Sequence, residues 1–282
     1  PRERDHVAAA PAGWVAGVSD RGVRHSRNED AMALLADAEP GSRAALVVCD
    51  GVSTSADSDV ASLAAARAAV EVIAAGSVGM AGRGALAGVL GRRVEAAVLV
   101  AADAVAATGD PSGDSPPSCT FVAAAVERDL VVVGVVGDSR AYWLPDAGEP
   151  AVLTVDDSWA AQEIAAGTAR EEAESGPQAH AITRWLGVDS PDQVPRLSTL
   201  EVDGPGWLLL CSDGLWNYCS EPGAIGQVVR TALDGAGGEP GAACEALVAW
   251  ANAQGGHDNI TVVLARLGTA AAGTGRENGE QA

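Results

Sequence analysis

The chain has 282 residues, of which 48% are hydrophobic and 20% charged, a composition typical of a globular protein with one large domain or two small ones. The formal net charge of −20 argues against a nucleic-acid partner, because phosphate backbones would repel the surface. No apolar run reaches the roughly 18–20 residues that span a membrane, so we expect no membrane association. The opening segment PRERDHVAAA is charged and lacks the apolar stretch of a secretory signal, which predicts a cytoplasmic location.

Short apolar runs rich in β-branched residues predict strands, and apolar residues at helical spacing predict helices. Two helices, a block of strands and two further helices predict an α+β fold in which helix pairs cover both sides of the sheets. In chain order, we expect strands at 14–19, 32–36 and 44–49, helices at 57–75 and 85–107, strands at 121–126, 130–136 and 207–211, helical faces at 225–232 and 244–251, and a strand at 260–265.

Three segments lack this patterning. Residues 108–118 are rich in turn-forming residues and predict a surface loop. Residues 154–195 mix short helical fragments with turn residues, which fits a small flap-like insertion. Residues 268–282 carry no core-forming side chains and predict a flexible tail. We therefore expect an N-terminal extension at 1–12 and one domain at 13–267, with the flap-like insertion inside it.

Acidic residues recur where the predicted strands begin or end. In an antiparallel sheet the end of one strand lies beside the start of its neighbour, so these carboxylates can converge on one edge. Packed like charges repel strongly without counter-ions, and oxygen ligands without accompanying Cys or His favour magnesium or manganese over zinc or copper. The alternative is that each acid belongs to an ordinary turn or only keeps the surface soluble. The acids in question are Glu29, Asp30, Asp50, Asp138, Asp213 and Asp258.

The neighbours of these acids favour the metal interpretation, because they form a series of motifs in a fixed order. The motifs are SDRGVRHSRNEDA at 19–31, VVCDG at 47–51, SCTFVAAAV at 118–126, VGDSRAYWL at 136–144, LTVDDSW at 153–159, AITRWLG at 181–187, LLLCSDGLWNY at 208–218 and GGHDNITVVL at 255–264. On these motifs, from about Trp14 to Leu267, the chain resembles the protein phosphatase 2C family of metal-dependent protein phosphatases, in its bacterial form.

The resemblance implies a four-layer αββα sandwich, in which two antiparallel sheets are flanked by helix pairs. It implies hydrolysis of phosphoserine and phosphothreonine in proteins by a hydroxide that bridges two divalent ions, without a phospho-enzyme. The implied cofactors are two Mn²⁺ or Mg²⁺ ions, with a third, weaker site known in bacterial relatives. The implied role is in signalling, where the chain acts as a monomer on phosphorylated proteins and opposes a serine/threonine kinase.

By the same resemblance, four positions would hold the two main ions. Asp50 would bridge both ions, and the carbonyl oxygen of Gly51 would help to hold one of them. Asp213 and Asp258 would hold the other ion. Asp138 would contribute with Asp213 to the third site. Asp50, Asp213 and Asp258 would therefore take part directly in catalysis.

Other residues would act around these ligands. Glu29 would act mainly through metal-bound water, with Asp30 nearby. Ser139 and Asn259 would hold neighbouring ligands in place. His25 lies close to this region in the sequence, but a loop histidine is more often merely solvated, so we assign it no catalytic role.

The family places an arginine shortly before its Glu-Asp pair, where a guanidinium can grip the phosphate through two hydrogen bonds. Arg24 and Arg27 compete for this role. Arg24 fits the motif better, although its spacing to the pair is slightly long, and Arg27 also fits a solvated surface residue, so we favour Arg24. Two positions depart from the family: Val52 stands where many eukaryotic members carry a histidine, which leaves the general acid open, and Ser53 and Thr54 replace a glycine pair.

A second hypothesis is a catalytically weak or inactive pseudophosphatase, in which the same fold acts as a phosphoprotein-binding regulatory module. Such a module has no reason to keep a cluster of acids that repel one another. The presence of Asp50, Asp213 and Asp258 together therefore favours the enzyme.

Overall fold

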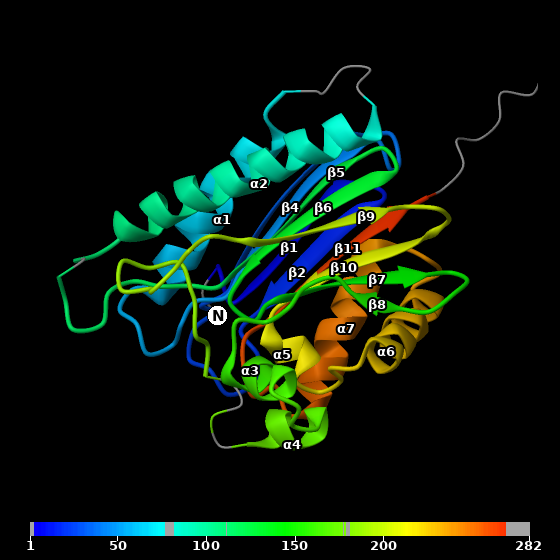
Figure 1. The fold of residues 1–282 in the computed structure, drawn as a ribbon. Coiled ribbons are helices and arrows are strands. Elements are labelled where there is room, and N and C mark those ends of the chain that lie inside the picture. The colour runs from blue at the N-terminus through cyan, green and yellow to red at the C-terminus, as the bar shows by residue number, and fades with distance from the viewer. Residues whose placement is uncertain (1–2, 77–81, 111, 177, 179–180, 269–282) are drawn as a thin grey trace, which may run out of the picture.

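Two antiparallel β-sheets lie face to face, and a pair of helices covers the outer side of each (Figure 1). The structure is a computed structural model that describes residues 3–76, 82–110, 112–176, 178 and 181–268. Its layers are those of the αββα sandwich expected from the sequence, so the predicted fold class is confirmed.

The six-stranded sheet combines segments from both ends of the chain. Its strand order is β1-β2-β11-β10-β7-β8, and neighbouring strands are antiparallel. The sheet therefore places the first and last strands of the fold close together, with only β2 between them. The strands are β1 (His6–Ala12), β2 (Val15–Asp20), β7 (Arg140–Pro145), β8 (Ala151–Val152), β10 (Gly206–Cys211) and β11 (Ile260–Leu267).

The five-stranded sheet has the order β3-β4-β5-β6-β9 and is also antiparallel. Its central strands are apolar on both faces because one face packs on helices and the other on the second sheet. In β4, for example, Val47 belongs to the helix side, and its neighbours Leu46 and Val48 belong to the layer between the sheets. The strands are β3 (Ala31–Ala36), β4 (Arg43–Cys49), β5 (Phe121–Glu127), β6 (Leu130–Val136) and β9 (Arg196–Glu201).

The helices form two covering pairs and a smaller group. α1 (Ser58–Ala74) and α2 (Arg83–Ala106) pack on the five-stranded sheet, and α6 (Pro222–Gly235) and α7 (Pro240–Gln254) pack on the six-stranded sheet. Both helices of the second pair begin with proline, whose missing N–H has no intrahelical partner to lose at that position. The remaining helices are α3 (Trp159–Ala165), α4 (Arg170–Ser175) and the single turn α5 (Asp213–Trp216).

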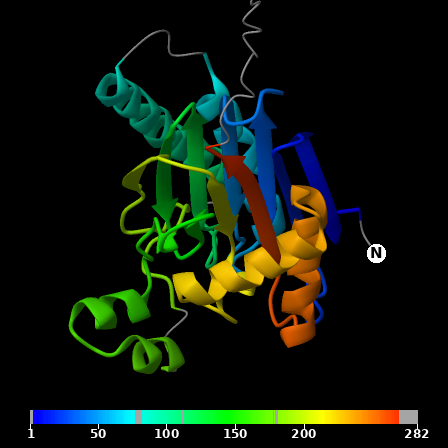
Figure 2. The ribbon, with the colours of Figure 1, turned by 90° about the vertical axis from the view of Figure 1, so that its right-hand side faces the viewer.

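The segment between β8 and β9 protrudes from the sandwich (Figure 2). It contains α3 and α4, which bury their own small apolar cluster of Ala160 and Ala173 with Ile164 beside them. This segment corresponds to the insertion expected at 154–195, and its action as a flap stays a prediction. Apart from Gly268, the expected tail at 268–282 lies outside the described residues. Within the part of the chain that the structure describes, no helix is both long and apolar enough to cross a membrane.

The structure departs from the expected boundaries at the start of the chain. Residues 6–12, expected to belong to an extension outside the domain, instead form β1 and pair with β2, with His6 opposite Asp20. An edge strand needs little apolar surface, and most of β1 is exposed, which explains why it gave no sequence signal. The strands β7, β8 and β9 were also not predicted, and four of the six residues of β9 are exposed.

Candidate metal centre

Two acids of the five-stranded sheet lie side by side. β3 and β4 pair with Ala31 opposite Cys49. Asp30 comes directly before this pair and Asp50 directly after it, so the antiparallel register brings both to the same end of the sheet. Thr120 fixes the second acid, because its N–H donates to the Asp50 carbonyl oxygen at 2.7 Å and its Oγ1 accepts from the Asp50 N–H at 3.1 Å.

The six-stranded sheet brings three further acids to its own end. β10 and β7 pair with Cys211 opposite Arg140. Asp213 lies two residues after this pair and Asp138 two residues before it, so the register directs both to one end. Asp258 lies just before β11, the strand on the other side of β10.

Two glycines allow the loops that carry these acids to touch. A Cβ on Gly51 would lie 2.6 Å from the carbonyl oxygen of Glu29 and 2.7 Å from that of Ser58. A Cβ on Gly214 would lie 1.9 Å from the carbonyl oxygen of Asn259. Any larger residue at either position would force the loops apart, so the close approach of the acidic motifs requires glycine.

The acids lie close enough to raise the pKa of one another. Burial raises the pKa of Asp50 and of Asp213 well above the usual range, and repulsion from neighbouring acids, Asp258 among them, raises both further. Burial also raises the pKa of Asp30 to about 6 and that of Asp138 to about 7. Carboxylates from both sheets therefore share one electrostatic environment, in which a cation would be strongly stabilising.

Two carboxylate oxygens at this site are buried without a hydrogen-bond partner among the described residues. They are Asp30 Oδ1 and Asp213 Oδ1. The other oxygen of each carboxylate is satisfied: Asp30 Oδ2 accepts from Ser212 and Thr261 at 2.7 Å each, and Asp213 Oδ2 accepts from Asn217 at 2.9 Å. An unpartnered buried oxygen is unfavourable, and a bound cation would remove that penalty.

The oxygen donors of this site suit a divalent cation, but their side chains are not grouped as the ligands of one ion. Within the described ranges, no three His, Cys, Asp or Glu side chains are grouped closely enough to hold a metal ion. The oxygen donors and the two unpartnered buried oxygens nevertheless favour Mg²⁺ or Mn²⁺. The assignment of individual ligands therefore stays a prediction.

Glu29 is held by hydrogen bonds on both carboxylate oxygens. Its Oε1 accepts from Arg27 at 2.8 Å and from Ser58, and its Oε2 accepts from Ser53 at 3.0 Å. Burial opposes ionisation of this side chain, but these hydrogen bonds outweigh it and lower the pKa of Glu29. Glu29 is therefore an ionised carboxylate in a fixed orientation.

The two residues expected to hold ligands in place do contact the acidic loops. Asn259 Oδ1 accepts from the Glu29 N–H at 2.7 Å, and its Nδ2 donates to the carbonyl oxygens of Arg21 and Arg27 at 2.8 and 3.1 Å. Ser139 Oγ lies 2.8 Å from Thr120 Oγ1, the atom that accepts from the Asp50 backbone. These contacts join three loops that are distant in the sequence.

A set of hydroxyl side chains around the acids was not predicted from the sequence. Each bonds an acid or its backbone. Ser212 and Thr261 lie close to strand-end acids in the sequence, which was the signal that could have identified them, whereas Ser58 and Thr120 carry no such signal. They are Ser58, Thr120, Ser212 and Thr261.

The two candidate arginines differ in their contacts. The Arg27 side chain is 36% exposed, and its guanidinium pairs with Glu29 at 2.8 Å and with Asp59 at 3.4 Å. Arg24 is exposed, and the described residues contain no hydrogen bond or ion pair to its side chain. Its backbone N–H donates to the Gly256 carbonyl oxygen at 3.1 Å, which places Arg24 beside the loop of Asp258. The choice of Arg24 for phosphate binding stays a prediction.

Comparison with known proteins identifies the family. Residues 20–250 match the sequence model of protein phosphatase 2C. The chain belongs to this family. The serine/threonine phosphatase stp of Listeria innocua is 34% identical over 148 residues, which are 51% of this chain and 55% of the relative. The chain thus spans about half the length of the curated relatives it matches.

Solved structures support the family at the level of the fold. The serine/threonine phosphatase PstP/Ppp of Mycobacterium tuberculosis has a TM-score of 0.73 at 30% identity, over 90% of this chain and 97% of that chain. The catalytic domain of a PstP phosphatase in complex with two manganese ions has a TM-score of 0.68 at 26% identity, over 93% of this chain and 99% of that chain. The bacterial phosphatase 2C resemblance seen in the sequence is confirmed.

In this phosphatase 2C chain a cavity of about 740 Å³ adjoins the acids. Asp213 and Asp258 line one part of it, Trp216 and Tyr218 line the core side, and Ile164 of α3 lines the side of the protruding segment. A larger hollow of about 1120 Å³ lies at the opposite end of β10, where no site acid reaches. The smaller cavity is therefore the one that adjoins the acids of the candidate metal centre.

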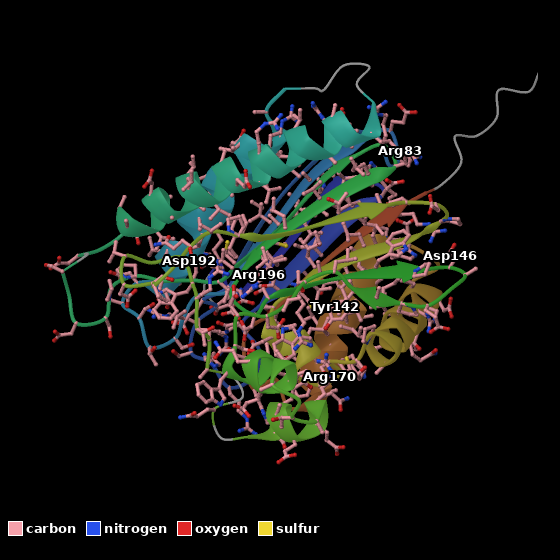
Figure 3. The ribbon with its side chains drawn as sticks, viewed as in Figure 1. Arg83, Tyr142, Asp146, Arg170, Asp192 and Arg196 are labelled. Atoms are coloured by element: carbon pink, nitrogen blue, oxygen red, sulfur yellow. The ribbon has the colours of Figure 1, made fainter. Side chains whose placement is uncertain are left out.

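Arg140 ties the protruding segment to the core of the phosphatase 2C chain. Its guanidinium donates to Asp156 at 2.7 Å and to Glu174 of α4 at 3.4 Å, and it stacks 3.6 Å over the Trp216 ring. It also donates to the hydroxyl of Tyr142, which is labelled in Figure 3. Because the Trp216 indole N–H donates to the carbonyl oxygen of Asp138 at 3.0 Å, this network reaches from α4 to the candidate metal centre.

Proposed function

We propose that this chain is a metal-dependent protein-serine/threonine phosphatase that hydrolyses phosphoserine and phosphothreonine in proteins. The observation that carries the proposal is the shared burial of acids from both sheets, with Asp30 Oδ1 and Asp213 Oδ1 left without partners. Family membership and the names of the relatives, which are serine/threonine phosphatases, support it. A bound cation would stabilise the ionised form of such a cluster.

We propose two ions, Mn²⁺ or Mg²⁺, held by the acids of both sheets. When bound, the ions would lower the pKa of a water nucleophile and offset the charge on the phosphoryl oxygens. The manganese-bound PstP structure supports Mn²⁺, and the all-oxygen donors are compatible with either ion. Asp138 would help to hold a third, more weakly bound ion. The proposed ligands are Asp50, Gly51, Asp213, Asp258, Glu29 and Asp138.

The chain's own residues bind and orient the reacting groups. The exposed guanidinium of Arg24 would bind the phosphate, since Arg27 is already engaged by Glu29. Thr120 holds the backbone of Asp50 from both sides, so that this acid keeps its position during turnover. Val52 carries no ionisable proton, so the chain supplies no acid for the leaving group at that position.

We further propose that the substrates are phosphorylated proteins whose modification a serine/threonine kinase introduces. The expected setting is the cytoplasm, and the expected form is a monomer. Neither a nucleic-acid partner nor a membrane partner is proposed, because the net charge of −20 repels phosphate-rich surfaces.

The test is release of phosphate from a phosphothreonine peptide with and without Mn²⁺. We expect turnover in Mn²⁺, loss of turnover in chelator, and loss by at least two orders of magnitude in Asp50→Asn and Asp213→Asn, because each removes a proposed ion ligand. Asp146→Asn is the matched control, since Asp146 pairs with Arg266 at the far end of the sheet (Figure 3). Mn²⁺ binding without turnover would favour the pseudophosphatase instead.

A further inference from the structure

The cavity beside the acids extends from the candidate metal centre to the protruding segment. Its volume of about 740 Å³ lies within the range of about 300–1,000 Å³ that is typical of ligand sites. Asp213 and Asp258 line the part next to the candidate metal centre, and Val155 and Ile164 of the protruding segment line another part. The cavity therefore has room for a phosphorylated side chain together with part of a neighbouring residue.

The charged side chains that the protruding segment and β7 contribute to this cavity already have partners. Arg140 donates to Asp156 at 2.7 Å. Arg170, labelled in Figure 3, pairs with Glu174 at 2.8 Å and with Glu221 at 2.9 Å. Each of these arginines and acids thus has an oppositely charged neighbour within the chain. A charged group of a substrate would have to compete with a pair that already exists.

The protruding side of the cavity exposes apolar side chains as well. Val155 is 62% exposed and Val152 is 37% exposed, and Ile164 is half-buried. All three line the cavity, together with Pro222 at the start of α6. Exposed apolar side chains that gather in one hollow mark a binding surface, because a bound apolar group releases the water that covers them.

The backbone around Val155 is fixed to the sandwich. On one side of it, the Thr154 hydroxyl oxygen accepts from the Ala141 N–H at 3.3 Å. Two residues beyond it, the Asp157 N–H donates to the Gly137 carbonyl oxygen at 2.7 Å. The exposed valine is therefore held in place, and an apolar surface that is already ordered loses little conformational entropy when a ligand binds.

We propose that this part of the cavity binds an apolar side chain of the substrate, close in sequence to the phosphorylated residue, and that Val155 and Ile164 select it. The inference rests on the proposed function, which places the phosphate beside Asp213 and Asp258. A charged side chain would lose its water in the apolar part of the cavity and gain no free partner there, so it binds less well. The preferred substrates are phosphopeptides with leucine or a similar residue near the phosphothreonine.

The first test compares phosphothreonine peptides that carry leucine, serine, lysine or glutamate in turn at each flanking position, in the presence of Mn²⁺. At one of these positions we expect kcat/KM to be about tenfold higher with leucine than with serine, because an apolar pocket gains free energy from each methylene that it buries. Equal values for leucine and serine at every position, or a preference for lysine or glutamate, would overturn the inference and leave the proposed function intact.

The second test concerns Val155 itself. In Val155→Ser the leucine-to-serine ratio should fall from about tenfold to about threefold or less. Leu99→Ser is the matched control and should keep the wild-type ratio, since Leu99 is 67% exposed on α2 and does not line the cavity. Both substitutions remove an exposed apolar side chain, so neither disturbs the core. A wild-type ratio in Val155→Ser would overturn the inference.

Calorimetric titration of the Mn²⁺-loaded chain with the leucine and serine peptides separates the inference from the proposed function. Tighter binding of the leucine peptide without release of phosphate from either peptide would support the inference and overturn the proposed function. Release of phosphate with equal affinity for both peptides would overturn the inference alone. If the chain neither binds nor hydrolyses the peptides, both are wrong.

Discussion

At the scale of a single residue, Asp30 shows that burying an ionised acid in the candidate metal centre lowers the stability of the fold. Burial raises its pKa to about 6, against a usual value near 3.8, although Ser212 and Thr261 donate to one of its oxygens. Asp138 shifts in the same direction, to about 7. Between pH 4 and 7 the folded chain therefore holds more protons than the unfolded chain, so its stability falls as the pH rises through that window.

We therefore expect the free energy of unfolding in chelator to fall between pH 5 and pH 8, and Asp30→Asn to remove about 1 kcal/mol of that fall, because only the part of its titration between pH 5 and a pKa of about 6 lies inside this window. The amide oxygen of asparagine can still accept from Ser212 and Thr261. Urea unfolding at the two pH values, with and without Mn²⁺, checks this. Asp146→Asn should keep the wild-type slope, because its ion pair with Arg266 lowers the pKa of Asp146 and places its titration below the window. A stability that rises with pH in chelator would contradict the account.

At the scale of elements, the start of the chain supports the metal centre as well as the sheet edge. Arg4, two residues before β1, donates to the backbone oxygens of Asp30, at 3.1 Å, and of Asp59. The side chain of Asn28 donates to the Arg4 carbonyl oxygen at 3.2 Å. The segment before β1 is therefore bonded to the loop that carries the Glu-Asp pair, and its loss would loosen that loop.

Arg4→Ala should lower the free energy of unfolding by about 1–3 kcal/mol, because it leaves two carbonyl oxygens with fewer donors. It should also weaken Mn²⁺ binding, since the backbone of Asp30 loses a restraint. Arg92→Ala is the control, because Arg92 lies on the exposed side of α2. Denaturant unfolding and calorimetric titration measure the two effects. Equal behaviour of the two variants would show that Arg4 does not support the centre.

At the scale of the whole molecule, one buried guanidinium connects the protruding segment to the sandwich. Arg140 bonds the segment through Asp156 and Glu174 and stacks on Trp216 of α5. A second connection runs through Asp157, which is fully buried and accepts from Arg196 of β9 at 2.8 Å. The segment is thus anchored near its start and through α4, and it projects from the sandwich (Figure 2).

Arg140→Lys should loosen this attachment, because lysine keeps the charge but cannot form the planar fork to Asp156 or stack on Trp216 in the same way. We expect faster limited proteolysis in the segment and a larger rise in KM for a phosphopeptide than for a small phosphate ester. Arg170→Lys should have little effect, since Arg170 is 42% exposed and its ion pairs are weak. If both substrates change equally, the segment does not contribute to peptide binding.

Prediction from the sequence succeeded where the pattern of apolar residues alone requires burial of the segment. The all-apolar runs of β4, β5 and β6 could only be buried strands, and the apolar stripe of α2 could only be a covering helix. Prediction failed for β1 and β9, because a half-exposed strand is stabilised mainly by pairing with its neighbour, and its own sequence pattern does not show that pairing. The sequence likewise left the role of Arg27 open, because its partner Asp59 lies on another element.

The sequence by itself determined the layers of the fold and the acids that gather at one end, because burial patterns and strand-end positions are local properties of the chain. Only the tertiary structure decided which oxygens are left without partners, which arginine is already engaged, and which apolar side chains line the cavity beside the acids. These depend on how loops from distant parts of the chain approach one another. The contact of Gly22 with the Asp258 backbone joins residues more than 200 positions apart, and no local pattern encodes such a distance.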